Sequence, residues 1–306
     1  MALLAIPNQI LWSYAVGGLV LALWLVWTFL REGRPKVRGR EVLVLLGPVF
    51  YAAPLAAFGT EHFTLNDIIT SMVPTWMPWP RFWAYVIGAC FIAAAFALVT
   101  RIRARLAASL LALTFFCFVV LMDIPGWLQD PRDRFGLTLA LRELAFSGGA
   151  LALATTLPGW RNERRRELLT TIARYFVAVP VVVYGIQQLM HGDHVPGVPL
   201  KKLMPEYVLG HAVWTYLAGV IFLVAGSLLL VGRKRRAAAT WLGATVLWLV
   251  LVVYVPIAVM QRPSFEGLNY FADTLMFCGA LLLLAGAMPR EAARQVAPMG
   301  SPQPGV

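Results

Sequence analysis

The sequence predicts an all-α polytopic membrane protein with nine transmembrane helices, on three observations. Of its 306 residues, 59% are hydrophobic and 13% are charged, and the mean hydropathy is +0.71, which a soluble domain does not need. Apolar runs long enough to cross a hydrocarbon core of about 30 Å recur from one end of the chain to the other. These runs are continuously apolar, whereas the strands of a membrane barrel alternate apolar and polar residues.

The first predicted span, at about 9–30, is an anchor that stands outside the pattern of the others. It has no basic residue before it and five after it, so it resembles a retained anchor more than a cleaved signal peptide. The eight spans that follow form two groups of four. The first group lies at about 42–59, 82–100, 106–122 and 138–157, and the second at about 170–189, 208–231, 237–258 and 269–288.

The two groups of spans resemble one another in sequence, which predicts a tandem repeat of one module. Residues 58–125 resemble residues 189–256 at a shift of 131 positions, so that Asp123-Ile124-Pro125 falls on Tyr254-Val255-Pro256. One residue away from that register, Glu143 falls on Asp273. Because each module has an even number of spans, the two copies are predicted to run parallel in the membrane.

These boundaries predict four segments. They are an anchor with a basic cytoplasmic loop over 1–40, a first four-helix repeat over 41–160, a second over 161–290, and a disordered cytoplasmic tail over 291–306.

Basic residues predict how the spans are oriented. Most of the 26 Lys and Arg residues follow the odd-numbered spans, in clusters at 31–40, 101–105, 161–166, 233–236 and 290–294. The positive-inside rule therefore predicts an amino terminus outside and a carboxyl terminus in the cytoplasm of a bacterial cytoplasmic (inner) membrane. The same clusters account for the net charge of +11, with the lipid bilayer and not nucleic acid as the partner.

Acidic and histidine side chains collect at one depth, near the predicted outer surface. An ionised carboxylate within a span costs a few kcal/mol, so each is expected to face the bundle interior and to have a partner there. Glu61 and His62 close the second span, Asp123 closes the fourth, and Glu143 and Asp273 lie within the fifth and the ninth.

This group is the candidate site. Glu143, Asp123 and His62 form the candidate proton relay, because a carboxyl group shielded from water can give or take a proton near neutral pH. The alternative is a structural network that fixes helix register, with the aromatic residues forming an ordinary interfacial belt. The candidate ligand-binding residues are Asp273, Glu61, Arg142, Trp83 and Tyr85.

Metal and thiol chemistry have weaker support. His191, Asp193 and His194 could bind a metal ion on the outer face, but their turn-rich surroundings favour a solvated loop, and no metal is predicted. The three cysteines lie within apolar spans without a C-x-x-C pair, which is typical of buried thiols.

Several motifs of the first module resemble the DoxX-like family of small four-helix membrane proteins, and the second copy is similar but more diverged. The resemblance covers roughly 41–288 and implies a four-helix unit associated with a quinone-reducing oxidoreductase, with quinone as the ligand. The motifs are Phe58-Gly59-x-Glu61-His62-Phe63, Val73-Pro74-x-Trp76-Met77-Pro78, Phe82-Trp83-x-Tyr85 and the basic run from Arg101 to Asp123-x-Pro125.

The expected function is a membrane component of a quinone-linked oxidoreductase with a carboxylate and histidine site near the outer face. The chain carries no nucleotide-binding motif and no cysteine ligand set, so no cofactor within the chain is predicted, and a soluble or membrane oxidoreductase subunit is the expected partner. Two alternatives stay open. One is a protein that binds or transports a lipid or small apolar molecule, and the other is a membrane assembly subunit whose acids are structural.

Overall fold

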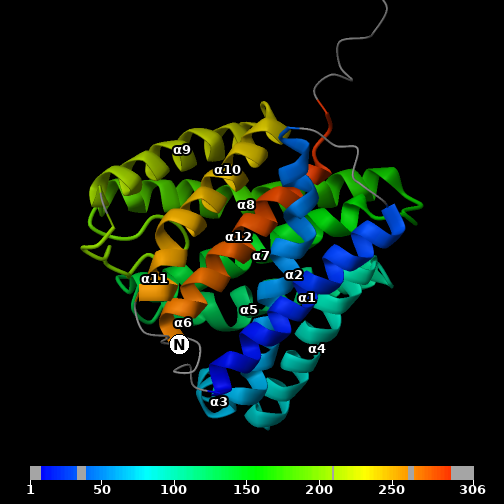
Figure 1. Cartoon of the computed structure of the whole chain (residues 1–306), viewed down its shortest axis with the longest axis horizontal. Coiled ribbons are helices and arrows are strands. Elements are labelled where there is room, and N and C mark those ends of the chain that lie inside the picture. The colour runs from blue at the N-terminus through cyan, green and yellow to red at the C-terminus, as the bar shows by residue number, and fades with distance from the viewer. Residues whose placement is uncertain (1–7, 33–38, 209, 261–264, 291–306) are drawn as a thin grey trace, which may run out of the picture.

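A computed structural model describes residues 8–32, 39–208, 210–260 and 265–290 of the chain (Figure 1). Within these residues the protein is all-helical without a strand, and nine of its helical segments are long and apolar enough to cross a membrane. The prediction of an all-α polytopic membrane protein is therefore confirmed. The predicted disordered tail, 291–306, and much of the first basic loop lie outside the described residues.

Each predicted span corresponds to a helix or to a series of helices. The elements are α1 (Asn8–Glu32), α2 (Glu41–Thr64), α3 (Asn66–Met72), α4 (Pro80–Thr100), α5 (Ala104–Phe118), α6 (Ile124–Trp127), α7 (Arg134–Thr156), α8 (Glu163–Met190), α9 (His211–Val231), α10 (Arg235–Leu249), α11 (Val255–Met260) and α12 (Phe265–Ala287). The short helix α3 was not predicted.

Two spans change their helix type at one point. A π-helical turn, Val119–Asp123, joins α5 to α6, and a second, Val250–Tyr254, joins α10 to α11. A proline stands two residues after the end of each turn. Proline has no N–H group to donate to the carbonyl four residues earlier, and its ring clashes with that carbonyl in a regular α-helix. The wider turn accommodates this misfit. The last residues of the two turns, Asp123 and Tyr254, are both buried.

The element bounds recur at the offset of 131 residues found in the sequence. Helices α4 and α9 have 21 residues each, and α7 and α12 have 23 each, and within each pair the first residues are 131 positions apart. The same offset relates α5 to α10 and the two π-helical turns to one another. In this register Asp273 stands at the position of Arg142. The alignment of Asp273 with Glu143 was therefore wrong by one residue.

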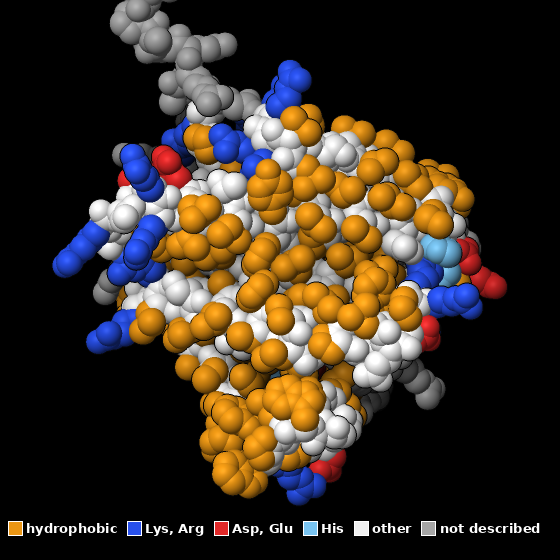
Figure 2. All heavy atoms as spheres, turned by 180° about the vertical axis from the view of Figure 1, so that it is seen from behind, with side chains coloured by type: hydrophobic (Ala, Val, Ile, Leu, Met, Phe, Trp, Pro, Cys, Tyr) orange, Lys and Arg blue, Asp and Glu red, His pale blue; other side chains and the backbone are white. Residues whose placement is uncertain are grey.

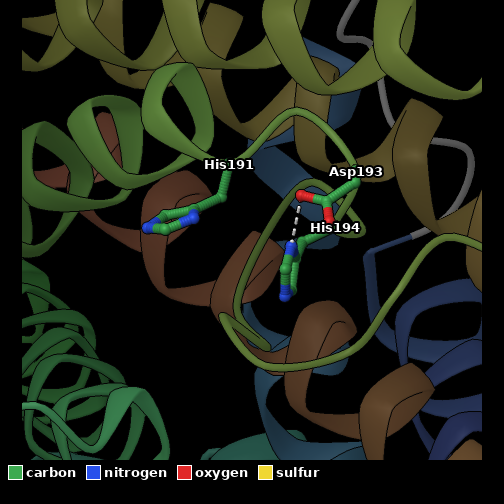
Figure 3. Close-up of side chains that lie close together, drawn as sticks. All are labelled: His191, Asp193 and His194. Carbon is green, nitrogen blue, oxygen red and sulfur yellow. Dashed lines mark hydrogen bonds and ion pairs between the residues drawn. The ribbon is translucent and has the colours of Figure 1, made fainter.

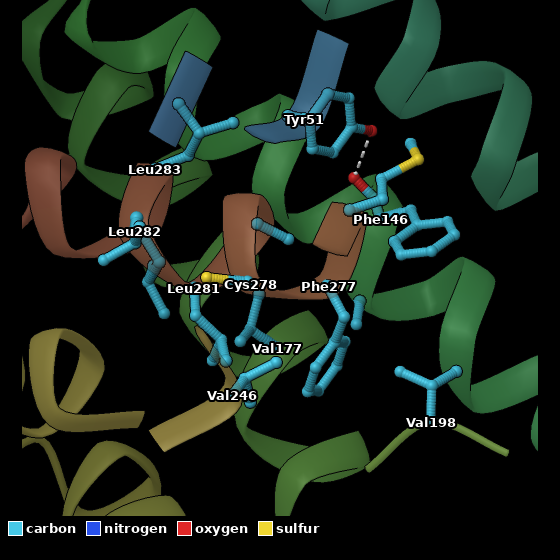
Figure 4. Close-up of a cluster of buried hydrophobic side chains, with 14 of the residues drawn as sticks. Tyr51, Phe146, Val177, Val198, Val246, Phe277, Cys278, Leu281, Leu282 and Leu283 are labelled. Atoms are coloured by element: carbon cyan, nitrogen blue, oxygen red, sulfur yellow. Dashed lines mark hydrogen bonds between the residues drawn. The ribbon is translucent and has the colours of Figure 1, made fainter. Parts of the chain in front are cut away.

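Helices α7 and α12 form the centre of the bundle. They pack against one another, and each also packs on the first helix of the other half, α7 on α8 and α12 on α2. Buried residues make up 67% of the α7 span and 72% of the α12 span, against 28% for the peripheral α1. Figure 4 shows the core around α12, where Tyr51 of α2 donates a hydrogen bond of 2.8 Å to the carbonyl of Phe146 in α7. The two halves therefore meet along α7 and α12.

Charged side chains mark the two ends of the bundle. Basic side chains gather at one edge, across a broad apolar surface from another edge that carries histidine with both acidic and basic side chains (Figure 2). We call the first edge, with the connections α4–α5, α7–α8 and α9–α10, the basic end, and we call the other, with α3, α6 and the α8–α9 loop, the acidic end.

A close approach of the two halves gives a test of this arrangement. A Cβ atom on Gly149 of α7 would lie 2.5 Å from the Cβ of Ala280 in α12. We expect Gly149→Ala to lower the free energy of unfolding by about 1–3 kcal/mol, because the extra methyl group forces α7 away from α12. Chemical denaturation of the purified protein in detergent measures this change.

Gly18→Ala in α1 is the matched control, since nothing lies within 4 Å of the added Cβ. Equal stability of the two variants would contradict a close α7–α12 contact.

Candidate functional site

The start of α7 is fixed by its capping residue. The carboxylate of Asp133 accepts hydrogen bonds from the backbone N–H groups of Phe135 and Gly136, both at 3.1 Å. These bonds hold the pKa of Asp133 below its usual value, and they satisfy two N–H groups that a helix start leaves free. The helix therefore begins at a defined residue, and Arg142 and Glu143 follow about two turns later.

Arg142 of α7 lies between two carboxylates. Its Nη1 donates to Oδ2 of Asp273 at 2.8 Å, and its Nη2 donates to Oε1 of Glu143 at 3.1 Å. The side chains of Arg142 and Glu143 are 20% and 13% exposed, and that of Asp273 is 9% exposed. Because Asp273 belongs to α12, this ion pair joins the two halves of the molecule at the acidic end.

A carboxyl pair extends the cluster to the π-helical turn. The carboxyl groups of Asp123 and Glu143 lie close enough to interact with one another. Two carboxyl groups can share a hydrogen bond when one of them carries a proton. No N–H or O–H group of the described residues reaches Oδ2 of Asp123 or Oε2 of Glu143, which is consistent with a proton held between the two acids.

Helices α1 and α2 close the cluster. Glu61, in the last turn of α2, is 4% exposed, is hydrogen-bonded to Asn269 of α12, and lies within electrostatic range of Asp273 and Arg142. Tyr14 of α1 lies within electrostatic range of Glu61 and Asp273. Its hydroxyl group is buried and has no hydrogen-bond partner among the described residues.

The charges of this carboxylate cluster do not balance. It holds one arginine and four carboxyl groups, which are Glu61, Asp123, Glu143 and Asp273. A second or third ionised carboxylate at this depth would lack a counter-ion, and its desolvation would cost several kcal/mol. Proton uptake is the cheaper way to neutralise the excess, so the arrangement can hold and release protons.

His62 lies apart from the carboxylate cluster. Its Nδ1 is 2.8 Å from the carbonyl oxygen of Phe58, and its ring packs edge-on against Phe91 of α4, with the ring centroids 5.6 Å apart. Neighbouring residues on a helix do not face the same way. Glu61 therefore meets α12 while His62 meets α4, and the structure does not bring His62 together with Asp123 and Glu143.

The predicted aromatic residues also lie on α4. Trp83 is half-buried and its Nε1 has no hydrogen-bond partner among the described residues. Tyr85 is 44% exposed, and its ring packs against Phe63 at a centroid distance of 5.5 Å. No described hydrogen bond, ion pair or ring contact joins either residue to the carboxylate cluster.

Tyr14 and Asn269 were missed by the sequence analysis. Tyr14 belongs to the anchor, which was treated as separate from the repeats, although the pair Ser13-Tyr14 is an unusual polar step in an apolar span. Asn269 begins the last span, where a polar residue is expected on position alone.

In the second half, the α8–α9 loop lies at the position that corresponds to the carboxylate cluster of the first half. Residues 191–208 fold inward at the acidic end, so that Val198 and Leu200 are 1% and 2% exposed. The hydroxyl of Tyr254 donates to the carbonyl of Pro196 at 2.8 Å, and Nε2 of Gln188 donates to the carbonyl of Gly197 at 3.2 Å. Backbone carbonyls of the loop thus accept hydrogen bonds from polar side chains that face inward in this half.

The same loop carries the histidine pair considered as metal ligands (Figure 3). The potential ligand atoms of His191, Asp193 and His194 lie within 4.8 Å of one another, and Nδ1 of His194 is 2.8 Å from Oδ1 of Asp193. Partial burial and the nearby guanidinium of Arg134 lower the pKa of His191. That guanidinium also disfavours a bound cation. The prediction of a solvated loop is wrong for residues 195–200, which are buried, and the absence of a metal remains a prediction.

No family model, curated protein or solved structure matches the chain. The DoxX-like resemblance therefore remains a prediction, and the candidate site rests on its own geometry.

The ion pair between α7 and α12 can be tested directly. Arg142→Gln leaves Asp273 and Glu143 without their cation, and we expect the free energy of unfolding to fall by about 3–5 kcal/mol. Adding Asp273→Asn should restore part of the loss, because it removes the unpaired charge. Denaturation of the purified protein in detergent measures both variants.

Arg81→Gln is the control, because its ion pair with Asp67 is exposed. If Arg142→Gln and this control had the same free energy of unfolding, the buried ion pair would not hold the two halves together.

Proposed function

We propose that this protein is a membrane component of a quinone-linked redox system, and that its carboxylate cluster exchanges protons with a bound quinone head group. The observation that carries the proposal is a single arginine enclosed by four largely buried carboxyl groups, two of which lie close enough to interact. Reduction of a quinone takes two electrons and two protons. A cluster with more carboxyl groups than cations can supply or accept those protons in a site closed to bulk water.

The proposed ligand contacts are the polar atoms that have no partner within the protein. The hydroxyl of Tyr14 and Nε of Arg142 are buried donors, and the quinone carbonyl oxygens are acceptors for them. Asp123 and Glu143 transfer the protons in this scheme, while a separate oxidoreductase subunit supplies or removes the electrons. His62 is left out, because its ring faces α4.

We further propose that the carboxylate cluster faces the extracytoplasmic side of a bacterial cytoplasmic membrane. Most of the described basic residues lie at the other end of the bundle, which the positive-inside rule places in the cytoplasm. The amino terminus is then outside and the carboxyl terminus inside. The recurrence of element bounds at 131 residues supports a tandem duplication of a DoxX-like four-helix unit.

The experiment compares the organic extracts of three purified proteins after mild solubilisation. We expect stoichiometric quinone with the wild type and at least about tenfold less with Glu143→Gln, because the variant loses a charge-assisted hydrogen bond at the site. Mass spectrometry identifies and quantifies the ligand. Asp67→Asn, an exposed acid in α3, should retain the quinone.

Other results would overturn the proposal. Equal quinone in wild type and Glu143→Gln would place the ligand elsewhere. A different lipid that is lost only in Glu143→Gln would instead support binding or transport of an apolar molecule. A wild-type protein without any extractable ligand would leave the carboxylate cluster with a structural role.

A further inference from the structure

The basic end carries a pocket that the proposed function does not use. Its volume is about 760 Å³, and it lies where α5 begins and the α7–α8 connection passes over it. Three arginines line it, Arg105, Arg161 and Arg165, together with Trp160 and Asn162. The concentration of positive charge in a concave site suggests an anionic ligand.

Two of these side chains are held in place before any ligand arrives. The indole Nε1 of Trp160 donates to the carbonyl of Ala154 at 3.0 Å, and the guanidinium carbon of Arg105 lies 5.7 Å from the Trp160 ring centroid. Gly159, with φ of +99°, allows this approach, because a Cβ there would lie 2.6 Å from Nη1 of Arg105. The cation is therefore fixed over the aromatic face.

The charge of the pocket is not neutralised within the protein. Among the described residues, no carboxylate pairs with any of its three arginines. Glu163, in the first turn of α8, is paired with Arg166 instead. Asn162 caps the same helix by accepting from the N–H of Arg165 at 3.0 Å, so the positive end of the helix dipole borders the pocket.

The second half shows which groups surround the arginine that is equivalent to Arg105. Arg236 stands 131 positions after Arg105, and it binds the carboxylate of Glu41 through Nη2 at 2.7 Å and Nε at 3.3 Å. Its Nη1 also donates to the carbonyl of Ala285 at 2.8 Å, at the end of α12. An anion therefore completes this arginine site in one half, whereas in the other half the chain provides none.

We propose that the pocket binds the phosphate head group of an anionic phospholipid from the leaflet at the basic end. Leu106, Leu110 and Leu113 are 52%, 54% and 58% exposed, and their spacing places them on one face of α5, which leads away from the pocket. This face provides an apolar path for acyl chains, which free phosphate does not need. Arginines bind phosphate oxygens through paired N–H donors, and basic residues at a membrane surface attract anionic lipids.

Native mass spectrometry of the full chain in detergent tests the proposal, with phosphatidylglycerol and phosphatidylcholine of the same acyl chains as probes. We expect the wild type to retain phosphatidylglycerol preferentially. Arg161→Gln with Arg165→Gln should weaken that binding by about tenfold or more. Asn162→Asp should also weaken it, because aspartate still caps α8 but places a carboxylate in the pocket.

The control is Arg164→Gln with Arg233→Gln, which removes the same charge from exposed positions at the basic end that do not line the pocket. It should bind as the wild type does. Equal losses in the control and in the pocket variants would overturn the site in favour of general surface charge. Equal retention of both lipids by the wild type, or complete displacement by millimolar inorganic phosphate, would overturn the lipid as the ligand.

Discussion

The ion pair between Arg142 and Asp273 is the interaction on which the architecture depends. A buried ion pair is tolerated when its geometry is good and the remaining polar atoms find partners, so the pair restricts how α7 and α12 can lie. Seven residues further along each helix, Gly149 meets Ala280 in another close contact between the halves. Seven residues are about two helical turns, so both contacts lie on one seam. Each contact joins a residue to the one 131 positions later, as expected at a pseudo-twofold axis.

This common framework carries different chemistry in its two halves. The π-helical turns present Asp123 in the first half and Tyr254 in the second, from the same depth and helix position. The tyrosine donates to a loop carbonyl, whereas the acid lies beside the carboxyl group of Glu143. The recurring helix bounds therefore supply the positions, and the side chains of one half concentrate titratable groups there. Stability and proton exchange can be separated in such a design, because the second half holds its fold without a carboxyl pair.

Hydropathy was sufficient to predict the nine spans, because length and apolar composition decide which segments can cross a membrane. The gathering of Glu61, Asp123, Glu143 and Asp273 at one depth also followed from their places along the spans. The direction that a side chain faces did not, since the helices are apolar on nearly every side and give no clear periodicity. Glu61 and His62 were therefore both predicted to belong to the candidate site, although they face different helices. The buried α8–α9 loop was likewise beyond prediction, because it is held by contacts with residues distant in the sequence.

The carboxylate cluster and the arginine pocket can act independently even though α7 leads from one to the other. Arg142 and Thr156, the last residue of α7, are 14 positions apart, which corresponds to roughly 21 Å along the helix axis. Most of α7 beyond Glu143 is buried against α8 and α12 and contains no charged side chain. A change of charge at one end therefore reaches the other mainly through rigid packing, and sites at this separation without shared partners behave additively.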